Sequence, residues 1–122
     1  MLFNQQQQIL SAPADFVADV YGLQGLCYGV STACTSGAKA LISAARLLRA
    51  GLCDAVVCGG VDTLSPLTIN GFNSLGVLSD GMANPFSAQR NGINIGEAAA
   101  AFVMTREADF GERLPLLGYG AG

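Results

Sequence analysis

Short apolar runs alternate along the chain with segments whose apolar residues recur at helical spacing. The continuous runs, which are typical of strands buried on both faces, lie at residues 25–31, 55–60, 98–105 and 114–117. The segments with helical periodicity lie at residues 12–21, 34–50 and 66–75. This alternation predicts an α/β fold in which the buried strands are mostly parallel.

Residues at the ends of these segments support the helix boundaries. Ser11 is a candidate N-cap for the helix at 12–21, and Gly22 follows its last residue. Gly51 follows the helix at 34–50, whose apolar residues cover most of its circumference, so we expect this helix to be central. The strand–helix–strand order over residues 25–60 predicts a right-handed parallel crossover.

Two other segments lack a regular apolar pattern. The polar tract Gln5–Gln8 precedes the first helix and is expected to be an exposed start. Residues 76–96 form a long connection interrupted by several glycines. A connection of that length within a small domain is usually functional or packed against other parts of the protein.

Composition limits the class of protein. The chain has 122 residues, enough for one domain with a core. Half of it, 51%, is hydrophobic and only 12% is charged, yet no window of about 18 uninterrupted apolar residues occurs, so no membrane segment is expected. The apolar surplus should therefore face protein. A net charge of −3 argues against nucleic acid and anionic membranes as partners.

Cysteines and histidines bear on cofactors and on the compartment. The four cysteines, at positions 27, 34, 53 and 58, form no C-x-x-C pair, and the chain has no histidine. Neither a metal site nor another cofactor is therefore expected. No secretory signal is visible at the N-terminus, and reduced thiols in the cytoplasm are the simplest account of the cysteines.

Cys34 stands where the predicted strand at 25–31 gives way to the predicted helix at 34–50. The first N–H groups of a helix are unpaired and the helix dipole is positive there, so a thiolate at this place is stabilised. This position favours a nucleophile. A small apolar residue without chemical function is an equally simple interpretation of a free cysteine.

Two serine-based patterns lie beside this cysteine. Residues 29–33 resemble the G-x-S-x-G turn of α/β-hydrolases, with Ser31 as the nucleophile, but no histidine is present to act as its base. Ser36 and Lys39 fit the S-x-x-K spacing of penicillin-binding enzymes, although no S-D-N or K-T-G pattern follows. We expect Lys39 to lie on a solvated face of the helix with Arg46.

Residues 30–37, with the sequence VSTACTSG, resemble the active-site signature of the β-ketoacyl-acyl-carrier-protein synthases, the elongating condensing enzymes of the thiolase superfamily. The resemblance extends from about Pro13 onward. Its further blocks lie at residues 51–62, 71–72, 78–79, 85–92 and 96–99. Several spaced blocks in the same order make this resemblance more specific than either serine pattern.

The resemblance implies a thiolase-like fold and a role for particular residues. Cys34 would be the acyl-accepting nucleophile, and its own backbone N–H would be one donor of the oxyanion hole. Phe72 matches an aromatic residue that lines the acyl pocket in relatives, with ordinary core packing as the alternative. Arg90 and Glu97 match positions that brace the long loop and the strand after it.

The resemblance also implies partners and a reaction. An acyl carrier protein would deliver acyl and malonyl groups on phosphopantetheine, for a decarboxylative Claisen condensation in fatty acid or polyketide synthesis. The enzyme class would be acyltransferase. The strand near Leu26–Ser31 would pair antiparallel with its twin across the axis of a homodimer.

The sequence departs from the family pattern in ways that narrow these expectations. Ser87 stands where relatives usually have aspartate. The two catalytic histidines and the lysine of the family belong to its C-terminal half, so we expect residues 1–122 to be a single incomplete domain, with 114–122 beginning that half. Such a piece would not catalyse the condensation alone. The alternative is a short non-enzymatic homologue that binds acyl carrier protein or a full-length synthase.

Overall fold

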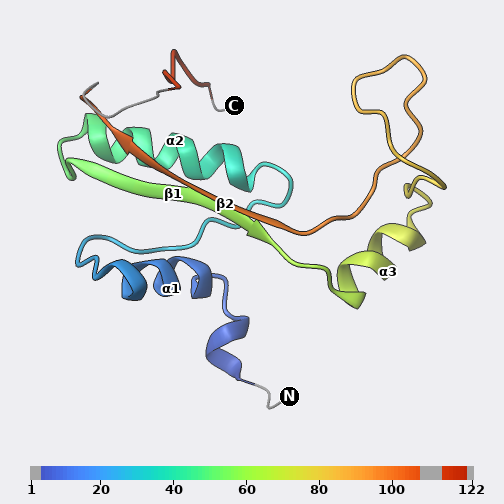
Figure 1. Ribbon diagram of the computed structural model, residues 1–122, viewed down its shortest axis with the longest axis horizontal. Coiled ribbons are helices and arrows are strands. Elements are labelled where there is room, and N and C mark those ends of the chain that lie inside the picture. The colour runs from blue at the N-terminus through green and yellow to red at the C-terminus, as the bar shows by residue number, and fades with distance from the viewer. Residues whose placement is uncertain (1–3, 108–113, 121–122) are drawn as a thin grey trace. The chain divides into compact units, whose positions relative to one another are not determined.

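The computed structural model describes residues 4–107 and 114–120 as a mixture of helices and strands (Figure 1). The elements are the 3-10 helix η1 (Gln5–Gln8), the helices α1 (Ala12–Tyr21), α2 (Ser36–Arg49) and α3 (Pro66–Ser74), and the strands β1 (Ala55–Asp62) and β2 (Ala98–Thr105). The expected α/β class is confirmed. Contacts divide the chain into two compact units, Met1–Gly60 with Ala100–Gly122, and Val61–Ala99. Each unit is described by itself.

Helix α1 has the predicted boundaries. Gly22 takes a left-handed conformation, φ 63°, and the N–H of Leu23 donates to the Ala18 carbonyl at 2.9 Å, which ends the helix. Ser11 does not cap the helix through its side chain, so that prediction is wrong. The turn after η1 pairs another N–H at the start of the helix, because the Ala12 N–H donates to the Ile9 carbonyl at 3.0 Å.

Buried residues of the first unit come from α2 and β1. The buried apolar side chains among the described residues are Ala44, Ala45, Leu48 and Cys58. Burial raises the pKa of the Cys58 thiol. Gly51, at φ 69°, ends α2, and the Leu52 N–H donates to the Leu47 carbonyl at 3.1 Å. The central position expected for α2 thus agrees with where the small core lies.

Strands β1 and β2 pair with each other, and their arrows run in opposite directions in Figure 1. The sheet formed by the described residues is therefore antiparallel, whereas the sequence predicted parallel neighbours. Gly59 allows the close pairing, because a Cβ at this position would collide with the Ala100 carbonyl oxygen. The expected burial is observed at Cys58 of β1 but not on most of β2, where Phe102 and Val103 are 55% and 70% exposed.

Residues 25–31 form no strand in the structure, and neither do residues 114–117. Both predictions are corrected, because an apolar run becomes a strand only when a neighbour hydrogen-bonds to its backbone. The segment at 25–31 instead passes against α1 and α2. A Cβ at Gly29 would collide with the Leu10 carbonyl, and the Tyr28 and Ser43 hydroxyls lie 2.5 Å apart.

The second unit contains α3 and the long loop of residues 76–96. Ser65 is the N-cap of α3, because its Oγ accepts a bond from the Thr68 N–H at 3.2 Å. The loop is held by a parallel bridge between Leu78 and Ile93 and by the side chain of Asn94. Asn94 accepts from the Ala83 N–H at 2.6 Å and donates to the Gly81 carbonyl at 2.8 Å. The predicted long connection is therefore an ordered loop.

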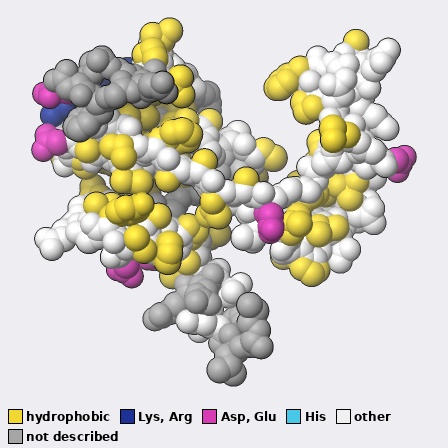
Figure 2. Space-filling model, in the orientation of Figure 1, with side chains coloured by type: hydrophobic (Ala, Val, Ile, Leu, Met, Phe, Trp, Pro, Cys, Tyr) yellow, Lys and Arg dark blue, Asp and Glu magenta, His cyan; other side chains and the backbone are white. Residues whose placement is uncertain are grey.

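Apolar side chains are widely exposed on both units, as the yellow areas of Figure 2 show. Leu26, Phe16 and Leu67 are 69%, 68% and 85% exposed. The expected surplus of apolar surface is thus present on these residues. Within residues 4–107 and 114–120, no helix is both long and apolar enough to cross a lipid bilayer.

Candidate active site

Cys34 lies in the turn that leads into α2, and its side chain is exposed. Helix α2 begins at Ser36 after the N-cap residue Thr35, two residues later than predicted. Its first i to i−4 bond is donated by the Lys39 N–H to the Thr35 carbonyl at 2.9 Å. Cys34 is therefore placed just before the helix and not on its first turn.

The residue before Cys34 has an unusual backbone conformation. Ala33 has a φ of 54°, in the left-handed region that residues with a Cβ avoid at a cost of about 1–2 kcal/mol. A residue in this region reverses or bends the direction of the backbone within one or two residues. The turn at Ala33 carries the path from the segment at 25–31 into α2, with Cys34 exposed at the turn.

Hydroxyl groups on both sides of Ala33 brace the turn. The Ser36 Oγ accepts a bond from the Thr32 N–H at 2.8 Å and donates to the Ala33 carbonyl at 2.6 Å. The Thr35 hydroxyl donates to the Thr32 carbonyl at 2.9 Å and lies 2.9 Å from the Thr32 hydroxyl. Sequence reasoning missed this network. The signal was the concentration of Ser and Thr just before a helix, where such side chains bond to nearby backbone.

The geometry does not support a nucleophilic role for Ser31 or Ser36 in the two serine patterns. The hydroxyl of Ser36 is committed to backbone groups on either side of Ala33, and among the described residues no hydrogen bond joins it to Lys39. Lys39 is exposed, as predicted. Ser31 is exposed too, but the chain contains no histidine to activate it.

The other cysteines are in different environments. The pKa of the Cys27 thiol is raised by desolvation, by its bond to Asp15, with Sγ and Oδ1 3.5 Å apart, and by the charges of Asp15 and Asp19. A raised pKa keeps this thiol protonated and weakly nucleophilic at neutral pH. Cys58 is buried and Cys53 is partly buried. Of the four thiols, Cys34 is the exposed one that lies on the braced turn.

Phe72 lies on α3 in the unit Val61–Ala99, and its side chain is half-buried. Cys34 belongs to the other unit. The hollow of about 290 Å³ beside α3 is lined by Leu64, Ile69, Leu78, Ser79, Ile93, Asn94 and Ile95, and Phe72 is not among them. The acyl-pocket role of Phe72 stays a prediction.

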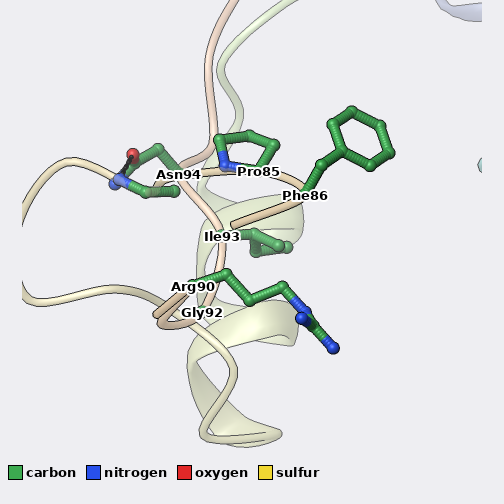
Figure 3. Close-up of a pocket in the computed structure, with 7 residues that line it drawn as sticks. Pro85, Phe86, Arg90, Gly92, Ile93 and Asn94 are labelled. Atoms are coloured by element: carbon green, nitrogen blue, oxygen red, sulfur yellow. Dashed lines mark hydrogen bonds between the residues drawn. The ribbon is translucent and has the colours of Figure 1, made fainter. Parts of the chain in front are cut away.

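A larger open cavity, of about 790 Å³, lies in the long loop (Figure 3). Its lining residues are Ala83, Pro85, Phe86, Arg90, Gly92, Ile93 and Asn94. Phe86 has a φ of 64° and is fully exposed, which no sequence pattern predicted. In Figure 3 the Phe86 ring and the Arg90 guanidinium extend away from Ile93 in different directions.

Arg90 and Glu97 have the bracing contacts expected of them. The Arg90 guanidinium donates to the Ser87 carbonyl at 3.1 Å, within the long loop. The Glu97 carboxylate accepts from the Leu64 N–H at 3.2 Å and so ties the residue before β2 to the residue before the Ser65 cap. In the described part of the chain, no group of three or more Cys, Asp or Glu side chains could hold a metal ion.

An α/β framework with an exposed cysteine on a braced turn, before the helix that carries most of the buried residues, agrees with a thiolase-like fold. Residues 3–109 match the family model of the β-ketoacyl synthase N-terminal domain, and the chain belongs to this family. The chain is similar to a solved ketosynthase, in complex with its chain length factor, from Xenorhabdus doucetiae. The TM-score is 0.81 and the identity 44%, covering 88% of this chain and 27% of that one.

Curated relatives support the same assignment. Nodulation protein E of Rhizobium leguminosarum bv. trifolii is 36% identical over 106 residues, covering 84% of this chain and 26% of the relative. The putative mitochondrial 3-oxoacyl-[acyl-carrier-protein] synthase of Schizosaccharomyces pombe is 32% identical over 104 residues, covering 79% and 24%. The chain thus spans about a quarter of the length of the relatives it matches.

Proposed function

We propose that this chain supplies the nucleophile of a β-ketoacyl-acyl-carrier-protein synthase, and that Cys34 is that nucleophile. The observation that supports the proposal is the exposure of Cys34 on a left-handed, hydroxyl-braced turn, in a chain of the β-ketoacyl synthase family. A thiol in such a place is accessible to a bulky thioester. The turn fixes the backbone from which the thiol projects.

The first chemical step is a transfer between two sulfur atoms. The Cys34 sulfur attacks the carbonyl carbon of an acyl thioester, a new C–S bond forms, and the bond to the pantetheine sulfur breaks. Pantetheine leaves as the free thiol with the proton that Cys34 gives up. The Cys34 N–H is proposed as one donor to the developing oxyanion.

The second step joins two carbon atoms. A malonyl thioester loses carbon dioxide, its carbanion attacks the acyl group on Cys34, and the cysteine sulfur is released as the new C–C bond forms. In the family this step relies on histidines that stabilise the enolate, and none of the 122 residues is histidine. We therefore propose that the chain alone accepts an acyl group but does not condense it.

The proposed partners are an acyl carrier protein and a second, similar chain. Residues 25–31 pair with no strand among the described residues, and Leu26 is 69% exposed. An apolar segment with free backbone groups suits antiparallel pairing with its twin in a dimer. The similar ketosynthase from Xenorhabdus doucetiae was solved in complex with its chain length factor. Fatty acid or polyketide synthesis in the cytoplasm is the proposed setting.

Phe72 is proposed to line the acyl pocket once the synthase is assembled. Its half-buried ring on α3 leaves apolar surface for an acyl chain. This part of the proposal concerns the whole enzyme, because Phe72 and Cys34 belong to different compact units.

Intact-mass spectrometry with an acyl thioester of N-acetylcysteamine tests the nucleophile. The wild-type chain should gain one acyl group, and Cys34→Ala should gain none. Cys27→Ala is the matched control, because Cys27 is the other exposed thiol and its raised pKa makes it a poor acceptor. Labelling that persists in Cys34→Ala and is lost in Cys27→Ala would contradict the proposal.

A non-enzymatic binding module remains the second candidate. The extent of exposed apolar surface, with Leu67 85% and Leu117 92% exposed, favours a role in binding another protein. On this hypothesis the Cys34→Ala chain would bind acyl carrier protein or a full-length synthase as tightly as the wild type, and neither would be acylated. Acylation of the wild-type chain at Cys34 would argue against it.

A further inference from the structure

The left-handed residue before Cys34 needs support from its neighbours. Ala33 has a φ of 54°, which is disfavoured for alanine. Its methyl side chain cannot form a hydrogen bond that would stabilise this conformation. Natural proteins often use glycine at such a place because it lacks a Cβ. Where alanine takes this conformation, surrounding contacts must hold it there.

The Ser36 hydroxyl contacts the backbone on both sides of this residue. It accepts a hydrogen bond from the Thr32 N–H at 2.8 Å and donates one to the Ala33 carbonyl at 2.6 Å. Both bonds are made by the same oxygen atom. The backbone N–H of Ser36 donates to the same Ala33 carbonyl at 3.0 Å. Ser36, the first residue of α2, thus hydrogen-bonds to both Thr32 and Ala33 in the turn that carries Cys34.

The hydroxyl of the neighbouring residue, Thr35, has different hydrogen-bond partners. Thr35 bonds to the Thr32 carbonyl and lies near the Thr32 hydroxyl, but no hydrogen bond joins its side chain to Ala33 among the described contacts. Thr35 is exposed, whereas Ser36 is half-buried. Ser36 is therefore the side chain whose contacts fix the left-handed residue directly.

We propose that Ser36 is a positioning residue for Cys34, acting through the backbone of Ala33. Its hydroxyl holds the left-handed conformation that presents the thiol to an incoming thioester. This inference rests on the proposed role of Cys34. It adds that the rate of acylation depends on a hydroxyl group that does not touch the substrate.

The test compares the acylation rate of Cys34 in a set of variants, by intact mass with the N-acetylcysteamine thioester. Each of the two Ser36 hydrogen bonds is worth a factor of about 3 to 10 in an equilibrium. We therefore expect Ser36→Ala to acylate about tenfold more slowly than the wild type. Ser36→Thr, which keeps the hydroxyl, should stay within about threefold. Ser43→Ala is the matched control, because it removes a hydroxyl from the same helix, bonded to Tyr28 and not to the turn.

A double variant separates positioning from general damage to the fold. Glycine takes a positive φ without support, so Ala33→Gly in the Ser36→Ala background should restore most of the acylation rate. This rescue also serves if Ser36→Ala folds poorly. Equal rates in Ser36→Ala and Ser43→Ala, or no recovery in the double variant, would overturn the inference. Acylation that survives Cys34→Ala would instead overturn the proposed function, so the two failures are distinguishable.

Discussion

Replacing Gly92 by alanine should loosen the long loop of residues 76–96 more than a comparable change at Gly76 or Gly81. Gly92 has a φ of 60°, and a Cβ there would lie 2.7 Å from both the Ser79 nitrogen and the Val77 carbonyl oxygen. These two atoms belong to the bonds that close the loop. The Ser79 N–H donates to the Ile93 carbonyl, and the Ile93 N–H donates to the Val77 carbonyl, both at 2.9 Å.

The magnitude follows from two separate costs. The left-handed conformation costs an alanine about 1–2 kcal/mol. Backbone atoms cannot yield as a flexible side chain can, so the strand-like contact must open, and its two hydrogen bonds contribute about 0.5–1.5 kcal/mol each. The loop should therefore be destabilised by about 2–5 kcal/mol. A change of 2 kcal/mol alone corresponds to about a 30-fold shift in a local opening equilibrium.

Hydrogen exchange at the Ser79 and Ile93 amides measures this opening directly. Two other glycines of the loop separate the costs. Gly76→Ala should have only the cost of the left-handed conformation, because its φ is 64° and nothing lies within 4 Å of the new Cβ. Gly81→Ala meets neither cost, since its surroundings are equally open and its φ is not positive. Protection lost to the same extent in Gly92→Ala and Gly76→Ala would refute the argument from close contact.

Two further predictions concern the first unit. Leu48→Ala should lower the free energy of unfolding by about 2–5 kcal/mol, because Leu48 is 3% exposed. Leu52→Ala should change this free energy by less than about 0.5 kcal/mol, because Leu52 is 66% exposed. Urea unfolding followed by circular dichroism compares the two variants, and equal effects would contradict the assigned core. Asp15→Asn should lower the raised pKa of the Cys27 thiol and speed its alkylation by iodoacetamide about two- to fivefold at pH 8.5. Asp19→Asn removes only a charge and should have a smaller effect on the rate. An unchanged rate in Asp15→Asn would contradict the assigned environment of Cys27. The sign for stability follows from the same shift: the folded state holds the Cys27 proton more tightly than the unfolded state, so this contribution is present below pH 9.0 and is lost as the pH rises through the folded pKa.

Local signals made the helices predictable. The helix of residues 12–21 was predicted with its observed boundaries, because Pro13 and Gly22 act on the backbone within one turn of each end. The strand at 98–105 was also predicted with its observed boundaries, even though its four alanines suit a helix equally well.

Features that depend on distant partners, or on a single backbone angle, were not predictable. Residues 25–31 have the composition of a buried strand, but a strand needs a neighbouring backbone. Helices α1 and α2 instead contact this segment through the side chains of Asp15 and Ser43. The antiparallel pairing of β1 with β2 brings together segments separated by residues 63–97. Nothing in the residue types of Ala33 and Phe86 indicates their positive φ angles, since alanine and phenylalanine rarely adopt them.

The same distinction between local and distant contacts bears on what the chain can do alone. Every bond that braces the Cys34 turn joins residues between Thr32 and Ser36, so its geometry depends on five consecutive residues and the start of α2. By contrast, most of strand β2 and of the segment at 25–31 stays exposed, although β2 pairs with β1 and the Tyr28 hydroxyl contacts Ser43 of α2. Under the proposed function, acylation of Cys34 therefore needs only structure that this chain forms locally, whereas condensation relies on histidines, and none of the 122 residues is histidine. An acylated but non-condensing chain is the expected result of that difference.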